Sequence, residues 1–177
     1  MVRGFRNSLA KQIGESLVCA ELGRLDVLAT PLAGNVPTFD VVAADHLCRT
    51  LSIQVKATRG NTWPSSADHW MQIQYDPATK KQIYLGPVKL ATPELIWVCV
   101  AIGSSNGRDR FFVLTEADLQ KAIISGYRSW MERIGWQRPR HPETLRVDWG
   151  ISDIERFEDE WKLILSRLSG TEPASSG

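Results

Sequence analysis

Two neighbouring segments, residues 38–45 and 50–56, carry the clearest pattern of hydrophobic and polar positions in the chain. Both are short, contain β-branched or small apolar residues and are bounded by turn-forming residues, so the pattern predicts two strands joined as a hairpin. Alternate side chains of a strand point to opposite faces of the sheet. The second segment accordingly has an apolar face and a polar face, the first with Leu51, Ile53 and Val55 and the second with Ser52, Gln54 and Lys56.

The turn decides which residues of the two strands face each other. A hairpin symmetric about Leu47 places Asp40 directly opposite Gln54, and such opposed side chains have Cβ atoms about 5 Å apart. Lys56 follows one pleat further along, on the face of Gln54. The sequence therefore predicts that an acid, an amide and an ammonium converge on one patch of the sheet, where apolar residues are the usual occupants.

Residues 8–23 are predicted to form a helix, with Ser8 as its N-cap and Gly23 at its C-terminal end. Glu15 lies at the angular position of apolar residues of this helix. A partly buried carboxylate needs a cation or hydrogen-bond donors. A metal ion would satisfy that need, and a nearby Lys or Arg would do so equally well.

The rest of the chain predicts an α/β protein. Thr115 is expected to cap a helix over residues 117–134, and Ser152, with Glu155 as its capping-box partner, is expected to begin a last helix. The apolar stripe of that last helix is expected to dock on the core, with a homodimer interface as the alternative. Further strands are predicted at 26–30, 82–85, 95–102 and 110–114.

The composition is that of an ordinary globular protein, with 177 residues, 43% hydrophobic and 23% charged, and a net charge of +1. We expect one domain over residues 1–169 and a disordered tail over 170–177. The small net charge excludes a global field that attracts nucleic acid, so any such surface is a local patch. The apolar runs predict neither a signal peptide nor a membrane span, and three cysteines without metal-ligand spacing fit reduced thiols in the cytoplasm.

Two segments combine arginine with tryptophan, a combination that suits a nucleic-acid backbone and its bases. Residues 58–70 follow directly on Lys56 and contain Arg59 and Trp63. They either contact DNA or cover the sheet edge with tryptophan as part of the core, and the sequence favours neither. The second segment, residues 128–146, forms either a basic patch or a solvated loop rim, and it carries Arg128, Arg133, Arg138 and Arg140.

Asp40, the triplet Gln54-Val55-Lys56 and Glu15 together resemble the pattern of the PD-(D/E)xK, or restriction-endonuclease-like, nuclease superfamily. In that family an Asp begins one strand, an acidic-x-Lys triplet lies on the next strand, and a Glu lies on the preceding helix. This chain has Gln where the acid of the triplet usually stands, and the family's proline is displaced to Pro37. The resemblance covers residues 7–58 and implies a mixed central β-sheet flanked by helices.

The resemblance also implies metal-dependent hydrolysis of phosphodiester bonds, with DNA as the expected substrate and Mg²⁺ or Mn²⁺ as the cofactor. Asp40, Glu15, the amide oxygen of Gln54 and the carbonyl of Val55 are the implied metal ligands, and Lys56 orients the attacking water. Two alternatives stay open. One is a catalytically inactive nucleic-acid-binding or protein-interaction module, which the Gln54 substitution favours, and the other is a subunit that cleaves only with a partner chain.

Overall fold

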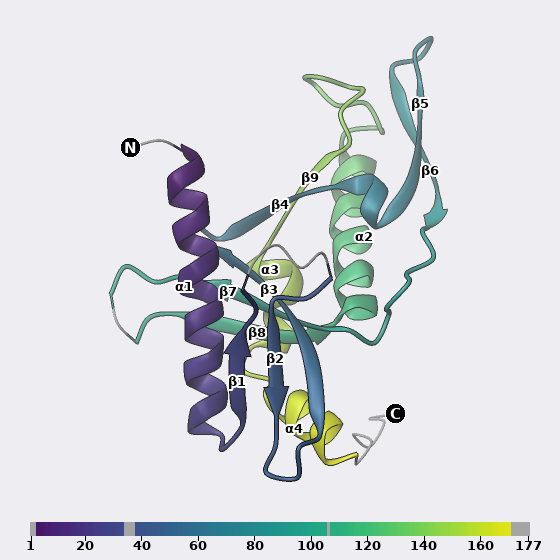
Figure 1. The fold of residues 1–177 in the computed structure, drawn as a ribbon. Helices are drawn as coiled ribbons and strands as arrows, with labels where there is room; N and C mark the ends of the chain where they lie inside the picture. Colours follow the sequence, from purple (N-terminus) through teal and green to yellow (C-terminus); the bar gives the residue numbers. More distant parts are fainter. Residues whose placement is uncertain (1–2, 34–37, 106, 171–177) are drawn as a thin grey trace.

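The computed structural model describes residues 3–33, 38–105 and 107–170, and its centre is a five-stranded mixed sheet (Figure 1). Neighbouring strands are antiparallel except β3 and β7, which run parallel. Every residue of β7 is apolar, as expected for a strand that is covered on both faces. The strands in spatial order are β1 (Leu28–Pro31), β2 (Val41–Ala44), β3 (Thr50–Thr58), β7 (Ile96–Ala101) and β8 (Arg110–Thr115).

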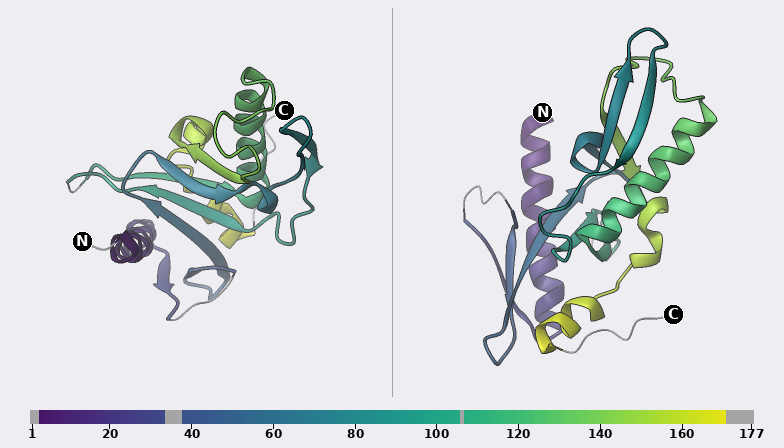
Figure 2. Two further views of the ribbon diagram at one scale, coloured as in Figure 1. Left: turned by 90° about the horizontal axis from the view of Figure 1, so that it is seen from above. Right: turned by 90° about the vertical axis from the view of Figure 1, so that its right-hand side faces the viewer.

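Helix α1 (Arg3–Arg24) packs on one face of the sheet, as the view from above shows (Figure 2). A Cβ atom at Gly14 would collide with the side chain of Ala57 on β3, so only glycine allows this close approach. Val18 and Leu22 of the helix join Ile53 and Val55 in one buried cluster. Helix α4 (Lys162–Ser169) extends the same cluster through Ile164 and Leu168.

The other face of the sheet carries α2 (Glu116–Arg133) and an antiparallel pair, β4 (Thr62–Ser66) and β9 (Arg146–Gly150). The hydroxyl of Thr115 accepts a hydrogen bond from the backbone N–H of Asp118 at 3.1 Å, which confirms the predicted cap. A second antiparallel pair, β5 (Met71–Asp76) and β6 (Lys81–Pro87), projects as a hairpin beside α2 (Figures 1 and 2). The 3₁₀ turn η1 (Ala67–His69) links β4 to β5.

The predicted last helix is wrong in its extent, because three short pieces replace it. They are α3 (Ile151–Ile154), η2 (Glu155–Phe157), which follows α3 directly, and α4, which is separated from η2 by residues that include an extended Glu158 and Asp159 with φ of 53°. Arg110 of β8 makes two hydrogen bonds of 2.6 Å to the carboxylate of Glu158. These bonds hold the non-helical segment between η2 and α4 against the sheet. The first piece is capped by Asp153, which accepts from the N–H of Gly150 at 2.8 Å, in place of Ser152 and Glu155.

Two further predictions need correction, and the sequence pattern misses three strands. Ser8 is not an N-cap, because α1 begins earlier and the Ser8 hydroxyl donates to the carbonyl of Gly4 within the helix. The strand expected from Asp26 begins at Leu28, since Asp26 has a φ of 58° and belongs to the turn after α1. Strands β4, β5 and β9 were not predicted.

The predicted fold class, a mixed central sheet flanked by helices, is confirmed. Pro37 and the tail beyond Gly170 lie outside the described residues. Within the described ranges, no helix is both long and apolar enough to cross a membrane. The cysteines are free thiols, with Cys19 half-buried, Cys48 exposed and Cys99 buried.

Candidate active site

The register of the β2–β3 hairpin is the predicted one. Val41 pairs with Ile53, and the N–H of Asp40 donates to the carbonyl of Ile53 at 2.9 Å. This alignment puts Asp40 opposite Gln54, as symmetry about Leu47 requires. Asp40 immediately precedes β2 and is only 6% exposed, one of few buried polar side chains in the described part of the protein.

The Asp40 carboxylate is held on three sides. Its Oδ2 atom accepts a hydrogen bond from the backbone N–H of Val55 at 2.9 Å and another from the side-chain amide of Gln54. Its Oδ1 atom lies 3.0 Å from the Lys11 ammonium, which reaches in from α1. Because β2 is shorter than β3, the N–H of Val55 lies beyond the end of β2, and the carboxylate takes the place of the missing strand partner.

Glu15 joins this group through Lys11. Its Oε1 atom lies 3.6 Å from the Lys11 Nζ atom, one helical turn away on α1, and its side chain is 15% exposed. Burial, followed by the nearby Asp40 carboxylate, raises the pKa of Glu15. The hydrogen bond to Asp40 is the main reason why the pKa of Lys11 is raised. These groups line a hollow of about 280 Å³, here called the acidic hollow, with Ser8, Gln12, Leu32 and Phe39.

Lys56 lies in a neighbouring hollow, and not with Asp40 and Glu15 as predicted. This basic hollow, of about 500 Å³, is lined by Arg6, Lys56 and Arg59 together with Asn7, Ala10, Ala57, Thr58, Gly60, Trp63 and Pro64. Burial lowers the pKa of Lys56, and its ammonium makes no hydrogen bond or ion pair within the described ranges. The lysine that contacts Asp40 is therefore Lys11, which was not predicted; its i, i+4 spacing to Glu15 was the available signal.

The acidic hollow has two carboxylates that could share a divalent cation. The Lys11 ammonium lies between one oxygen of Asp40 and one of Glu15, so a single cation can be held by both carboxylates. No group of three or more His, Cys, Asp or Glu side chains suited to a metal occurs among the described residues. Gln54 directs its amide nitrogen to Asp40, and neither Gln54 nor the Val55 carbonyl, which is 3.5 Å from the Gln54 Nε2 atom, lines the hollow. The two carboxylates fit Mg²⁺, which is bound through one or two carboxylates and keeps several waters.

Trp63 is a core residue and not a platform for stacking bases, which corrects its predicted role. Its side chain is 1% exposed, and its ring stacks on Trp149 at a centroid distance of 4.8 Å. Its Nε1–H donates to the carbonyl of Lys56 at 3.0 Å, so Trp63 fixes the backbone beside Lys56. Arg59, by contrast, is exposed at the rim of the basic hollow.

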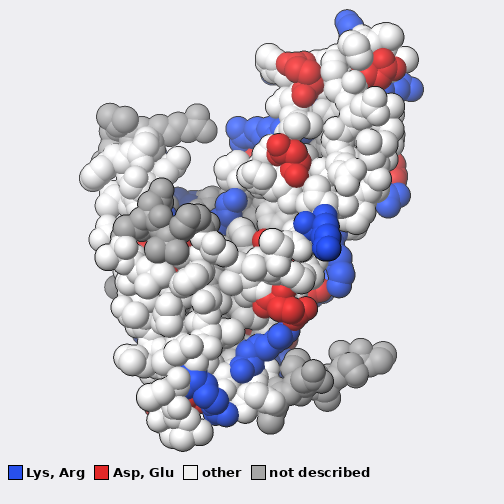
Figure 3. Space-filling view, turned by 45° about the vertical axis from the view of Figure 1, so that its right-hand side comes forward, with Lys and Arg blue, Asp and Glu red and all other residues white. Residues whose placement is uncertain are grey.

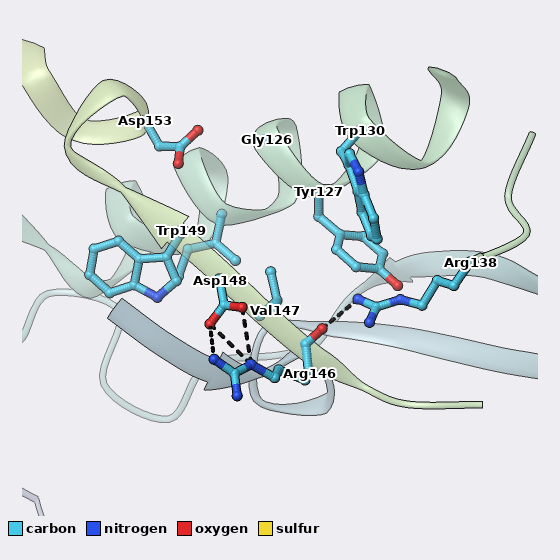
Figure 4. Close-up of a pocket in the computed structure, with 10 residues that line it drawn as sticks. Gly126, Tyr127, Trp130, Arg138, Arg146, Val147, Asp148, Trp149 and Asp153 are labelled. Carbon is cyan, nitrogen blue, oxygen red and sulfur yellow. Dashed lines mark hydrogen bonds and ion pairs between the residues drawn. The ribbon is translucent and has the colours of Figure 1, made fainter. Parts of the chain in front are cut away.

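The predicted arginines of segment 128–146 lie on the far side of the molecule from α1, along α2 and the loop that follows (Figure 1). Arg128 lies over the Tyr84 ring at 5.2 Å and within 3.6 Å of Glu132. Arg138 lies over Trp130 at 4.8 Å and lines a cavity of about 300 Å³ beside β9 (Figure 4). Arg133 and Arg140 are exposed.

Two parts of the surface are separated by a notch. The space-filling view shows it between the part that carries α1 and the part that carries the β5–β6 hairpin, with Lys and Arg side chains on the hairpin side and at the bottom of the notch (Figure 3). The two hollows border α1, and the 128–146 arginines belong to the other part.

Comparisons with known proteins give one distant likeness. No family model matches the sequence, and no curated protein matches it. Among solved structures, that of a bacterial homing endonuclease, I-Ssp6803I, aligns with a TM-score of 0.48 at 12% identity, over 94% of this chain and 98% of that chain. A likeness at this level carries no argument about function, which therefore depends on the geometry of the two hollows.

Proposed function

We propose that this protein is a metal-dependent nuclease that hydrolyses phosphodiester bonds in DNA. The observation that carries the proposal is the pair of hollows beside α1, one with two carboxylates and the next with three cations and, in the described chain, no acid in its lining. Metal-dependent hydrolysis of a phosphodiester in a nucleic acid needs both kinds of group. Oxygen ligands hold a cation near the reacting phosphorus, and cationic side chains bind the flanking phosphates.

In this proposal Asp40 and Glu15 would hold Mg²⁺ or Mn²⁺, and a neutral oxygen from Gln54 or from the Val55 carbonyl would be a further ligand. A metal ion bound there would lower the pKa of a water and offset charge in the transition state. The bonds from Val55 N–H and Gln54 fix the Asp40 carboxylate before substrate arrives, which is the preorganisation that charge stabilisation requires.

Lys56 has a different task from the metal ligands. Its ammonium is half-buried and unpaired within the described ranges, so it is available to a phosphate oxygen or to the attacking water. Arg6 and Arg59 line the same hollow, and their positive charges are available to the flanking phosphates of the nucleic-acid strand. The exposed Arg133 and Arg140, across the notch, are the proposed second contact for a longer nucleic acid.

The test uses labelled single-stranded and duplex DNA and RNA with Mg²⁺, Mn²⁺ or EDTA. Asp40→Asn keeps the shape of the side chain and removes its charge, so cleavage should be lost while thermal unfolding stays cooperative. Asp68→Asn, at an exposed position of η1, is the matched control and should cleave normally. Cleavage that persists in EDTA or in Asp40→Asn would contradict the proposal.

A second candidate is a nucleic-acid-binding module that does not cleave. The observation that favours it is Lys11, which already neutralises the carboxylates that a metal needs. Salt-dependent DNA binding with no cleavage under any metal condition would support this candidate over the nuclease.

A further inference from the structure

The acidic hollow contains its own cation. The Lys11 Nζ atom is 3.0 Å from Asp40 Oδ1 and 3.6 Å from Glu15 Oε1. The Lys11 side chain as a whole is 50% exposed. The carboxylates are far less accessible, with side-chain exposures of 5% for Asp40 and 15% for Glu15. A partly exposed cation therefore closes a site made of two sheltered anions.

This arrangement has an electrostatic reason. Two carboxylates at low exposure repel each other, and the hydration that each loses on burial is not compensated unless a cation is close. Gln54 donates to Asp40 but brings no charge. In the described part of the chain, Lys11 is the one side chain that forms ion pairs with both acids.

We propose that the Lys11 ammonium is an internal counter-ion that occupies the cation position between Asp40 and Glu15 until a divalent ion displaces it. The inference rests on the proposed function in one respect, namely that the acidic hollow takes a divalent metal. It adds that metal binding is a competition with a residue of the protein itself.

The competition couples metal binding to nucleic acid. A displaced Lys11 ammonium needs a new anion, and a phosphate at the mouth of the hollow supplies one. Nucleic acid should therefore favour metal binding, and by thermodynamic reciprocity the metal should tighten nucleic-acid binding by the same factor. Without nucleic acid, Lys11 lowers the affinity of the hollow for metal.

Calorimetric titration with Mn²⁺ in the absence of nucleic acid tests the competition. Lys11→Met keeps much of the side-chain length and removes the charge, so we expect Mn²⁺ to bind about tenfold more tightly or better, since a cation no longer opposes it. Lys11→Arg keeps the charge and should bind no more tightly than the natural protein. Lys121→Met removes a lysine that pairs with Asp118 on α2 and is the control for a general change in net charge.

A second readout tests the counter-ion role without metal. In EDTA, Lys11→Met should lower the melting temperature, because Asp40 and Glu15 then repel each other without compensation. The same substitution made in Asp40→Asn should cost less, since one of the two anions is already gone. Equal losses in both backgrounds would show that Lys11 acts through packing alone.

The outcomes separate this inference from the nuclease proposal. If the natural protein binds Mn²⁺ and cleaves DNA, but Lys11→Met binds Mn²⁺ with unchanged or weaker affinity, Lys11 is not a competitor and only the inference fails. If neither protein binds Mn²⁺ and any cleavage resists EDTA, the metal-dependent function fails and the inference fails with it.

Discussion

The carboxylate of Asp40 accepts a hydrogen bond from the backbone N–H of Val55 at 2.9 Å, at the point where β2 has ended and β3 continues. The bond replaces a ladder hydrogen bond that a longer β2 would have supplied. It explains how an acid tolerates a position that is 6% exposed. Together with the Gln54 amide, which donates to the same oxygen, this bond leaves the other carboxylate oxygen facing Lys11 on α1.

Trp63 should matter for stability and not for base stacking. Trp63→Phe removes the donor that satisfies the Lys56 carbonyl and leaves space beside Trp149, so we expect the free energy of unfolding to fall by about 1–3 kcal/mol. Urea unfolding measures the change. Phe5→Leu, at a residue 57% exposed, is the control and should leave stability nearly unchanged. Normal stability with weakened DNA binding in Trp63→Phe would restore the stacking role.

The basic hollow predicts a particular dependence of DNA affinity on salt. Each phosphate contact that is lost should reduce the slope of log affinity against log salt concentration by about 0.7 to 0.9. We expect that reduction for Arg6→Gln and for Arg59→Gln, measured by fluorescence anisotropy. Arg128→Gln is the matched control, because its guanidinium already lies over Tyr84 and beside Glu132. A smaller slope for Arg128→Gln alone would move the contact surface to α2.

Lys56 should make the free energy of unfolding depend on pH at the alkaline side. Burial lowers its pKa, so the unfolded chain binds this proton more tightly than the folded protein does. Stability therefore rises with pH between the lowered pKa and the ordinary pKa of lysine, and at neutral pH the protein carries the full cost of the buried charge. Lys56→Met should be more stable than the natural protein at about pH 7, and the difference should shrink by about pH 10.

Urea unfolding across this pH range provides the measurement. For Lys89→Met, at an exposed lysine, the difference in free energy of unfolding from the natural protein should not change with pH in this way. If the free energy of unfolding varies with pH in the same way for Lys56→Met and the natural protein, the Lys56 ammonium is well solvated in the basic hollow.

The centre of the fold is predictable from the sequence because its signals there are local. The alternation in β3 and the short connection to β2 determine the register, so the residue pattern alone is enough to pair Asp40 with Gln54. β7 is equally predictable, because a short run of apolar residues bounded by turns is typical of a buried strand. By contrast, Pro64 argues against a strand at β4, which tolerates it because β4 pairs with β9 alone.

The candidate site is less completely predictable because its decisive contact is not local. Glu15 was expected to need a metal or a nearby Lys or Arg, and the structure supplies Lys11. The contact of Lys11 with Asp40 depends on how α1 crosses β2 and β3, which no spacing within the chain specifies. Lys56 was expected with Asp40 because both belong to one polar face, but the side chain lies in the next hollow, beside Trp63 and Arg59.

Gln54→Glu is the sharpest test of the acidic hollow, because it introduces a third carboxylate beside Asp40. At about 4 Å and an effective dielectric near 20, a unit charge and a divalent ion attract each other by roughly 8 kcal/mol before desolvation is subtracted. The new acid also replaces a donor to Asp40, so the metal-free protein should be less stable while the metal-bound protein gains. We therefore expect Mn²⁺ to bind Gln54→Glu more tightly in calorimetry, and to raise its melting temperature more than that of the natural protein. Gln74→Glu, on β5 and remote from the hollow, controls for the added charge. If Gln54→Glu binds Mn²⁺ no more tightly than the natural protein, Gln54 does not face a metal site, and the non-cleaving binding module becomes the better account of these hollows.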